Sequence, residues 1–559
     1  MIRKSREKRL ETKIIFVTGG VCSSLGKGIV AASTAAILKS AGKKVSIMKL
    51  DPYLNVDPGT MSPFQHGEVF VLDDGGETDL DLGHYERFID VPLNKFCSVT
   101  TGKVYREVLN EEREGKYLGG TIQVVPHITA KIIEKIELAA EKSGAEILVC
   151  EIGGTVGDIE GEPFIEVVRQ MKSTYGKQVL SMHLTLLPYL AASGELKTKP
   201  TQISVRQLRA LGVSPDLIFA RADKKIPQSL LKKIAYFCDV NEEAVIPAET
   251  VKSIYEVPLR FQKYNLGKIL AEKLGYDDLA FDLDEWKQGV EKIKNSKETI
   301  QIGLAGKYNE LDDAYLSVIE AIKSAGFSVD RKAEIVWIDT EKIEHDDADE
   351  LEKLQAVAGV VVPGGFGNRG IEGKIKVAQF CRENNKPYLG LCLGSQIMAI
   401  EFARNVLGIE KATSEEFDEI ERECGCTCAP VEYKHGKEFH LVHFMEEQRT
   451  VRAKGGTMRL GAYPCKIEAG TLAEKLYGQA EISERHRHRY EFNNAFRDQL
   501  SEKGFVFSGT SPDGELVEIV ENPACDFMIA AQFHPELISR PFKPHPLFKG
   551  LLEASIKLQ

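Results

Sequence analysis

"KIIFVTGGVCSSLGKGIVAASTAAILKSAG", residues 13–42, places an apolar β-branched run, a glycine-rich turn and an amphipathic run in direct succession. This order predicts a strand, a tight loop and a helix. Similar apolar runs follow at 44–49, 146–150, 179–187 and 216–223, with helical patterns between several of them. The first half of the chain is therefore predicted to form a parallel sheet with helices on both faces, an α/β fold of the P-loop type.

The second half repeats the alternation after a change in composition. From about residue 277 the chain is charged and lacks strand patterns, and strands resume at "TIQIGLAG", residues 299–306. Apolar runs at 333–339, 357–365, 387–392, 516–521 and 527–533 then predict a second α/β domain. We expect a first domain over 1–277, a partly helical linker over 278–298 and a second domain over 299–559.

Composition excludes several classes of partner. The chain has 559 residues, 43% of them apolar and 28% charged, with a net charge of −11. An acidic protein of this kind is not expected to bind nucleic acid or anionic membranes. The basic N-terminus has no apolar run behind it, and no run approaches the roughly 18 residues that span a membrane. Together with 11 scattered cysteines, these features predict a cytoplasmic protein with free thiols.

One cysteine stands at a sharp strand-to-helix turn. In "LGLCLGSQ", residues 389–396, Cys392 lies between Gly390 and Gly394, after an apolar run and before helical spacing. Flanking glycines tolerate a strained turn, and a helix N-terminus favours the thiolate over the thiol. Cys392 is therefore a candidate nucleophile, although the position alone fits a buried, inert cysteine equally well.

A nucleophilic thiolate needs a base, and "AAQFHPE", residues 530–536, offers one. Pro535 favours extended backbone before it, so His534 and Glu536 can project to the same side. A third motif, "VVVPGGFGNRG" (360–370), ends a strand in glycines whose N–H groups can face an oxyanion. Each motif alone also fits a surface loop, but their joint occurrence in one domain is far more specific.

The order glycine loop, cysteine, His-x-Glu resembles that of the class I glutamine amidotransferases. The resemblance implies that Cys392 attacks the carboxamide of glutamine, that His534 transfers the proton, that Glu536 orients His534, and that ammonia is released. A zwitterionic amino acid is well matched by a carboxylate and a guanidinium. Without the resemblance, the basic run 484–490 would suggest a small phosphate or nucleic-acid patch. The residues implied to hold glutamine are Gly365, Leu393, Gly394, Ser395, Gln396, Glu416 and Arg489, with Gly365 and Leu393 forming the oxyanion hole.

The glycine-rich loop "VTGGVCSSLGKG", residues 17–28, is a candidate phosphate site at a helix N-terminus. It has one more residue between its glycines than G-x4-G-K-[ST], and Gly28 follows Lys27 where a hydroxyl usually meets the metal. Mg²⁺ would then need other oxygens, and Asp81 and Glu151 are candidates. The loop also fits an ordinary glycine-rich turn, and the carboxylates fit a solvated surface.

Longer strings make a second resemblance. Residues 19–33, 47–88, 151–164 and 194–208, among them "EIGGTVGDIEGEPF" and "GELKTKPTQISVRQL", resemble the synthase domain of the CTP synthase family, in which an amidotransferase domain follows. The resemblance implies that ATP phosphorylates O4 of UTP and that ammonia from glutamine attacks C4, giving CTP. It also implies Mg²⁺ with ATP, no organic cofactor, activation by GTP, feedback inhibition by CTP, and a homotetramer.

The same resemblance assigns nucleotide contacts. It implies Lys49 as a second cation near the transferred phosphate. It places Mg²⁺ at Asp81 and Glu151. The residues implied to bind ATP are Ser24, Leu25, Gly26, Lys27, Gly28, Ile29 and Asp81; those implied to bind UTP are Ser23, Lys197, Thr198, Lys199, Pro200, Thr201, Gln202 and Lys233; and those implied to bind inhibitory CTP are Asp158, Ile159 and Glu160.

Two other functions stay open at this point. A glutamine-dependent ligase of the cobyrinate-diamide type would share both domain classes, but it has no evident use for "KTKPTQ" (197–202) as a triphosphate clamp. A scaffold protein derived from the enzyme would be expected to have lost catalytic residues, which are present here. "ECGCTCAP", with Cys424, Cys426 and Cys428, has no family explanation, and its spacing is not that of usual zinc sites.

Overall fold

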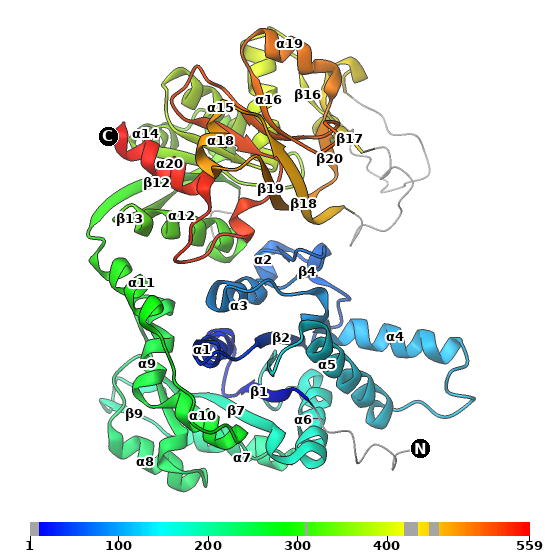
Figure 1. The fold of residues 1–559 in the computed structure, drawn as a ribbon, viewed down its shortest axis with the longest axis vertical. Helices are drawn as coiled ribbons and strands as arrows, with labels where there is room; N and C mark the ends of the chain where they lie inside the picture. The colour runs from blue at the N-terminus through cyan, green and yellow to red at the C-terminus, as the bar shows by residue number, and fades with distance from the viewer. Residues whose placement is uncertain (1–10, 308–310, 419–433, 446–457, 559) are drawn as a thin grey trace. The chain divides into compact units, whose positions relative to one another are not determined.

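Two α/β units make up the chain in the computed structural model, which describes residues 11–307, 311–418, 434–445 and 458–558 (Figure 1). The first unit comprises Met1–Pro58 and Asp81–Val290, and the second comprises Gly59–Leu80 and Glu291–Gln559. The segment Gly59–Leu80 thus groups with the second unit although its sequence neighbours belong to the first. The predicted domain limits at 277 and 299 stay predictions.

The first unit is built on a seven-stranded sheet in the order β11-β10-β7-β1-β6-β2-β5. All neighbouring strands are parallel, which confirms the predicted sheet type. The apolar runs of the first half form five of these strands because both faces of a parallel sheet are buried. The strands are β1 (Lys13–Gly19), β2 (Val45–Asp51), β5 (Ser98–Thr100), β6 (Ile147–Ile152), β7 (Val179–Leu186), β10 (Leu217–Ala222) and β11 (Val245–Glu249).

Helices cover both faces of this sheet. One core contains Ile132, Ile136 and Phe164 from α5 and α6 packed against the strands. A second core on the same face contains Val205, Leu231 and Ile234 from α7 and α8. Helix α1 lies on the opposite face, where its Gly28 approaches Glu151 of β6. The helices of the unit are α1 (Lys27–Ser40), α3 (Asp81–Ile89), α4 (Thr101–Arg113), α5 (Thr129–Ser143), α6 (Glu162–Tyr175), α7 (Lys199–Ala210), α8 (Gln228–Phe237), α9 (Val257–Lys263) and α10 (Leu266–Leu274), while α11 (Asp284–Asn295) lies in the stretch expected to be partly helical.

The second unit contains a nine-stranded sheet in the order β13-β12-β14-β15-β23-β22-β21-β18-β19. The strands from β13 to β23 pair in parallel, and those from β23 to β19 pair antiparallel. The strands are β12 (Glu298–Gly306), β13 (Arg331–Asp339), β14 (Gly359–Val362), β15 (Tyr388–Leu391), β18 (Arg459–Ile467), β19 (Glu481–His488), β21 (Val506–Thr510), β22 (Val517–Glu521) and β23 (Met528–Ala531).

Two hydrophobic cores lie on opposite faces of the second sheet. Ile375, Ile397 and Ile400 from α15 and α16 pack on one face, and Ile322, Leu547 and Leu551 from α12 and α20 pack on the other. A small sheet of β16 (Thr413–Ser414), β17 (His440–Phe444) and β20 (Tyr490–Phe492) lies in the same unit. Its helices are α12 (Leu316–Ser328), α13 (Thr340–Glu344), α14 (Ala348–Ala356), α15 (Ile371–Glu383), α16 (Leu393–Asn405), α17 (Glu415–Asp418), α18 (Leu472–Tyr477), α19 (Arg497–Glu502) and α20 (Pro546–Lys557).

The segment Gly59–Leu80 adds α2 (Pro63–His66), β3 (Phe70–Val71) and β4 (Glu77–Thr78) to the second unit. Two arginines of β19 hold it. Arg485 Nε lies 2.6 Å from Asp73 Oδ1, and Arg487 Nε lies 3.0 Å from Glu77 Oε1. Arg485 and Arg487 alternate with buried histidines along the strand. The face of β19 that carries these arginines therefore contacts this segment.

Among the described residues, no helix combines the length and apolar character needed to cross a bilayer. The cysteines Cys424, Cys426 and Cys428 lie outside the described residues. Within the described part of the chain, no group of three or more His, Cys, Asp or Glu side chains is arranged to hold a metal ion.

Candidate active site

Cys392 occupies the turn between β15 and α16 with an unusual backbone. Its φ is 50°, a left-handed value that side chains other than glycine rarely adopt and that marks a strained turn. Its N–H donates to the Ala531 carbonyl at 2.7 Å, which ties the turn to β23. The residue is only 6% exposed, and it directly precedes the first turn of α16. The structure thus has the strand–turn–helix geometry that the sequence predicts around Cys392.

His534 and Glu536 form a close pair in the same unit. His534 Nδ1 lies 2.7 Å from Glu536 Oε1. Burial alone would lower the pKa of His534, but the carboxylate of Glu536 and the sulfur of Cys392 outweigh burial and raise it to about 10. The imidazole is therefore held in its protonated form over the neutral pH range, which suits a proton donor beside a thiolate.

Gly364 locates the histidine relative to the cysteine. A Cβ added at Gly364 would lie 3.0 Å from His534 Cε1 and 3.6 Å from Cys392 Cβ. Both side chains thus border one glycine. His534 Nε2 is buried without a hydrogen-bond partner among the described residues, so this atom is available to a substrate or leaving group.

The glycine loop after β14 is held by two lysines. The ammonium of Lys374 donates to the Pro363 carbonyl at 3.2 Å, and Lys307 donates to the Phe366 carbonyl. Burial lowers the pKa of Lys374 to about 7. Because the two lysines bind its carbonyls, the loop is fixed beside Cys392. An oxyanion site requires such a fixed loop.

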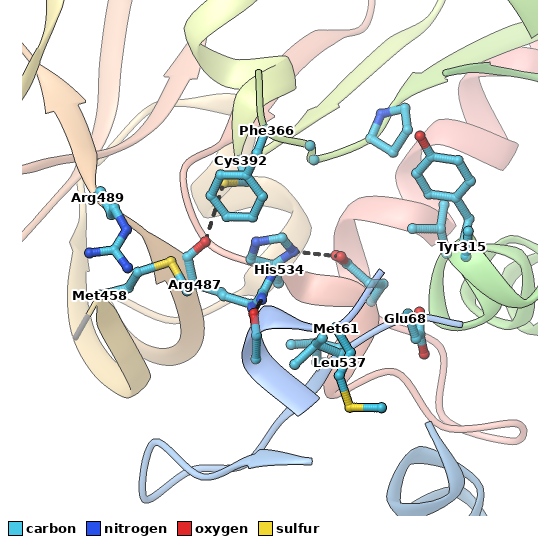
Figure 2. A pocket seen from close by; sticks show the side chains of 18 residues that line it. Met61, Glu68, Tyr315, Phe366, Cys392, Met458, Arg487, Arg489, His534 and Leu537 are labelled. Atoms are coloured by element: carbon cyan, nitrogen blue, oxygen red, sulfur yellow. Dashed lines mark hydrogen bonds and ion pairs between the residues drawn. The ribbon is translucent and has the colours of Figure 1, made fainter. Parts of the chain in front are cut away.

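A cavity of about 440 Å³ opens at this centre. Figure 2 shows Phe366, His534 and Arg487 gathered around Cys392, with Arg489 and Met458 nearby. Its volume falls within the range of small-molecule sites. The lining residues, all from the second unit, are Gly59, Met61, Glu68, Val69, Ala314, Tyr315, Val318, Pro363, Gly364, Gly365, Phe366, Cys392, Met458, Arg487, Arg489, His534, Glu536 and Leu537.

Of the residues predicted to hold glutamine, two line this cavity and the others lie beside Cys392 or the glycine loop. Gly365 and Arg489 line it. Leu393, Gly394, Ser395 and Gln396 form the buried first turn of α16 after Cys392. Glu416, in α17, accepts a hydrogen bond from the Gly367 N–H at 2.9 Å, which brings its carboxylate to the glycine loop.

Three residues near the sulfur were missed by sequence reasoning. The Arg487 carbonyl lies 3.9 Å from Cys392 Sγ, and Gln532 Nε2 lies 3.6 Å from it. Phe366 follows the two glycines of the loop and lines the cavity. Only the position of Gln532, two residues before His534, could have signalled its role.

The candidate phosphate loop, residues 17–28, lies before and at the start of α1 in the first unit. Gly26 caps that helix with φ 94°, a conformation that glycine adopts without strain. Lys27 Nζ donates to the Gly154 carbonyl at 2.6 Å. Burial lowers the pKa of Lys27, against the attraction of Glu151. Ser23, Ser24, Leu25, Gly28 and Ile29 lie in the same loop and first helical turn.

Lys49 forms ion pairs with three carboxylates beside that loop. Its Nζ contacts Asp81 and lies 3.0 Å from Glu151 Oε1 and 3.8 Å from Asp51 Oδ1. Burial raises the pKa of Glu151 against the attraction of Lys49. The pKa of Asp81 is lowered, because the pull of Lys49 exceeds the opposing effect of burial. The hydroxyl of Tyr85 also donates to Glu151.

These carboxylates fit a magnesium ion that arrives with a nucleotide. A Cβ at Gly28 would lie 2.6 Å from Asp81 Oδ1 and 3.3 Å from Glu151 Oε2, so both oxygens converge on the loop. Mg²⁺ is commonly held by one or two carboxylates together with substrate phosphates. The chemistry of these two carboxylates fits Mg²⁺, and their role as its ligands stays a prediction.

A second cavity of about 280 Å³ adjoins the phosphate loop. Ser24, Leu25, Gly26 and Ile29 from the loop face Arg221 across it. Ala248, Val251 and Phe261 supply apolar walls. A planar, mostly apolar group attached to a phosphate would suit this shape.

The predicted UTP residues are placed around the start of α7. Lys197 precedes the helix and pairs with Glu195 at 2.7 Å, while Lys199 and Pro200 begin it. Thr198 Oγ1 accepts from Gln202 Nε2 at 3.1 Å. Thr201 is fully buried, with its hydroxyl 2.9 Å from that of Thr185.

The remaining predicted residues lie on two other elements. Lys233 is on α8. Asp158 accepts from the Thr155 N–H at 2.9 Å, Ile159 is 80% exposed, and Glu160 follows in a short 3₁₀ turn. Asp158 lines a small cavity together with Thr18 and Gly19 of the loop. The assignment of these residues to nucleotides stays a prediction.

Comparison with known proteins bears on the whole chain. Residues 13–276 match the model of the CTP synthase N-terminus, and residues 310–554 match the class-I glutamine amidotransferase model. CTP synthases of Staphylococcus aureus strains JH9 and Newman are each 54% identical over 550 residues, covering 98% of this chain and 99% of the relative. The chain belongs to the CTP synthase family.

Membership of the CTP synthase family confirms the predicted two-domain α/β class and makes the chain a ligase with an amidotransferase domain. Among solved structures, a CTPS glutaminase domain from Trypanosoma brucei with bound acivicin is 36% identical. That match covers 46% of this chain and 94% of the other, with a TM-score of 0.40.

Proposed function

We propose that the protein forms CTP from UTP, using ATP and nitrogen released from glutamine. The observation that carries the proposal is that one chain of this family combines the Cys392–His534–Glu536 centre with a phosphate loop facing Lys49, Asp81 and Glu151. The first centre is suited to amide hydrolysis and the second to phosphoryl transfer.

In the glutamine half-reaction, Cys392 Sγ attacks the carboxamide carbon of glutamine. The N–H groups of Gly365 and Leu393 receive the developing oxyanion, and His534 gives its proton to the departing ammonia. Water then attacks the thioester, which releases glutamate and restores the thiol. Glu536 keeps the imidazole oriented and protonated, in keeping with the raised pKa of His534. The carboxylate of Glu416 and the guanidinium of Arg489 hold the amino acid ends of glutamine.

In the synthase half-reaction, O4 of UTP takes the terminal phosphoryl group of ATP, because a carbonyl oxygen is a poor leaving group. Ammonia then adds at C4 and phosphate departs, giving CTP, ADP and phosphate. Lys27 and the loop N–H groups would hold the ATP phosphates, and Lys49 would neutralise charge on the transferred group. The cavity bordered by Arg221 would receive the adenine ring, and Lys197–Gln202 with Lys233 would hold UTP.

Bound Mg²⁺ would supply positive charge to the ATP phosphates, with Asp81 and Glu151 as its protein ligands. Regulation belongs to the same proposal. We expect GTP to activate the glutamine half-reaction and CTP to inhibit through Asp158–Glu160, and we expect a homotetramer.

CTP formation from UTP, ATP and Mg²⁺, with either ammonium chloride or glutamine as nitrogen source, tests the proposal. Wild type should use both sources. Cys392→Ala should keep the ammonia-dependent reaction and lose the glutamine-dependent one by several orders of magnitude, since the covalent route is removed. Failure of the wild type with both sources, even with GTP, would favour another glutamine-dependent ligase or a scaffold.

A further inference from the structure

Gln532 makes a contact with the catalytic sulfur that the proposed function does not use. The residue follows β23 and precedes His534 by two positions, and it is only 3% exposed. Its side-chain nitrogen lies 3.6 Å from Cys392 Sγ. The amide can donate to the sulfur only through its NH₂ end, whereas its oxygen could only accept from a thiol S–H.

The neighbours of Gln532 decide which end that is. Gln396 Nε2 lies 3.3 Å from the Tyr490 carbonyl and 3.2 Å from Gln532 Oε1. A carbonyl oxygen only accepts, so Gln396 must direct its NH₂ group to Tyr490. Its second hydrogen then requires an acceptor, which is the oxygen of Gln532. The nitrogen of Gln532 is left facing Cys392.

The Tyr490 carbonyl, which fixes this polarity, is itself held by a buried chain. His488 Nδ1 lies 3.2 Å from it, and His486 Nδ1 lies 2.9 Å from His488 Nε2. Since the carbonyl accepts, His488 donates through Nδ1 and accepts through Nε2 from His486. Burial holds the pKa of both histidines well below the usual value, so both stay neutral and keep these donor roles.

The sulfur of Cys392 also faces two cationic groups, the imidazole of His534 and the amine of Lys374. Its contacts with the Arg487 carbonyl and with Gln532 favour different protonation states. The Arg487 carbonyl, 3.9 Å away, can accept only from a thiol S–H. The amide of Gln532 can donate to the sulfur, and such a bond is stronger when the sulfur carries a charge. We propose that Gln532 is a further catalytic residue of glutamine hydrolysis, whose amide holds Cys392 as a thiolate and fixes its direction of attack. This inference rests on the proposed function, in which Cys392 is the nucleophile.

Alkylation of Cys392 by iodoacetamide tests the inference without needing turnover. The rate at Cys392 is followed by peptide mass spectrometry between pH 6 and 10 in the full-length protein. Gln532→Glu places an acceptor beside the sulfur, and Gln532→Met removes the donor at similar volume. Both should slow alkylation at pH 7 by roughly tenfold or more and displace the profile to higher pH, with Gln532→Glu affected more strongly.

Asn522→Asp is the matched control. Asn522 is a buried amide whose Nδ2 lies 3.8 Å from Cys525 Sγ and 3.8 Å from Met528 Sδ, so the same chemical change is made beside other sulfurs. Its alkylation profile at Cys392 should be that of the wild type. Circular dichroism and thermal unfolding of each variant report that the second unit, which contains Gln532, is folded.

Two results would overturn the role of Gln532. One is a wild-type alkylation profile in Gln532→Met, and the other is an equal displacement in Asn522→Asp. Failure of the proposed function looks different, because a wild type that makes no CTP from ammonia would still give the Gln532-dependent alkylation profile. A loss of folding in Gln532→Glu leaves the near-isosteric Gln532→Met to decide.

Discussion

Gly28 stands where a phosphate loop usually carries a hydroxyl, and the structure supplies a reason. A Cβ there would lie 2.6 Å from Asp81 Oδ1, closer than real side chains approach, and 3.3 Å from Glu151 Oε2. The space that a serine or threonine would need is already taken by two carboxylates. In the proposed magnesium site, the two carboxylates would supply the oxygen ligands that a serine or threonine hydroxyl usually contributes.

Gly28→Ser should abolish most CTP formation from ammonia, because its side chain would displace Asp81 and disturb the magnesium ligands. Glutamine hydrolysis by the Cys392 centre should survive. The two activities can be assayed separately in one preparation. Gly161→Ala is the control, since its added Cβ meets nothing within 4 Å. Ammonia-dependent activity near the wild-type level in Gly28→Ser would show that the carboxylates tolerate the change.

The protonation of His534 leads to a pH prediction. Its pKa, raised to about 10 largely by Glu536 and Cys392, keeps the imidazole protonated until the pH rises through that value. In Glu536→Gln the carboxylate is lost, the pKa falls, and the proton is lost at lower pH. The alkaline limb of kcat/KM for glutamine hydrolysis should therefore move to lower pH.

Glutamate release measured between pH 7 and about 10.5 tests this, with Cys392→Ala giving the background rate. If His534 limits the reaction, the alkaline limbs of kcat/KM for wild type and Glu536→Gln must fall at different pH values. Coincident limbs in wild type and Glu536→Gln would mean that another group controls the alkaline side.

At the scale of elements, α15 approaches α13 so closely that only glycine fits at the crossing. A Cβ on Gly373 would lie 1.7 Å from the Thr340 carbonyl oxygen and 3.1 Å from the Glu344 nitrogen. These are backbone atoms, so no side chain can move aside. Since α15 follows the glycine loop, its position bears on the site.

Gly373→Ala should lower the free energy of unfolding by roughly 1–3 kcal/mol, the usual cost of overpacking. Chemical denaturation followed by circular dichroism measures it. Gln379→Ala on the same helix removes one surface hydrogen bond to Glu383 and should change stability by less than about 0.5 kcal/mol. Equal stability of the two variants would contradict the predicted clash.

Elements and site residues differed in how far the sequence could predict them. Strands buried on both faces, such as β1 and β6, were predicted because continuous apolar runs leave few alternatives. β19 was missed, because its alternating arginines and histidines are polar on both faces and their partners are remote in sequence. The placement of Cys392 at a sharp turn and the pairing of His534 with Glu536 were predicted from motifs. The contacts of Gln532 and Arg487 with the sulfur were not, because one depends on amide polarity and the other on a backbone carbonyl.

At the scale of the whole molecule, the segment Gly59–Leu80 is the least expected feature. No pattern in the sequence indicates that it groups with the second unit. The tie is substantial, because Arg485 is 1% exposed on its side chain, lies 2.6 Å from Asp73 and donates to the Val71 carbonyl at 3.1 Å. A buried guanidinium requires such partners.

Asp73→Ala should lower the thermal midpoint of the second unit, at a cost of roughly 1–3 kcal/mol, because it leaves a buried guanidinium undercompensated. In a double-mutant cycle, adding Asp73→Ala to Arg485→Met should cost little more. Asp74→Ala, one residue away, serves as the control. If the losses of stability in Asp73→Ala and Arg485→Met are fully additive, the ion pair between these two residues does not stabilise the fold.

The grouping of Gly59–Leu80 has a consequence for dividing the chain. Because the backbone passes from one unit to the other after Pro58, returns after Leu80 and leaves again after Val290, a single cut in the linker does not separate two self-sufficient halves. The N-terminal fragment would contain Gly59–Leu80, which belongs to the second unit. Two polypeptides produced from a gene split at the linker should accordingly copurify, each completing the other, whereas a C-terminal fragment made alone would leave Arg485 and Arg487 without the carboxylates that they bind.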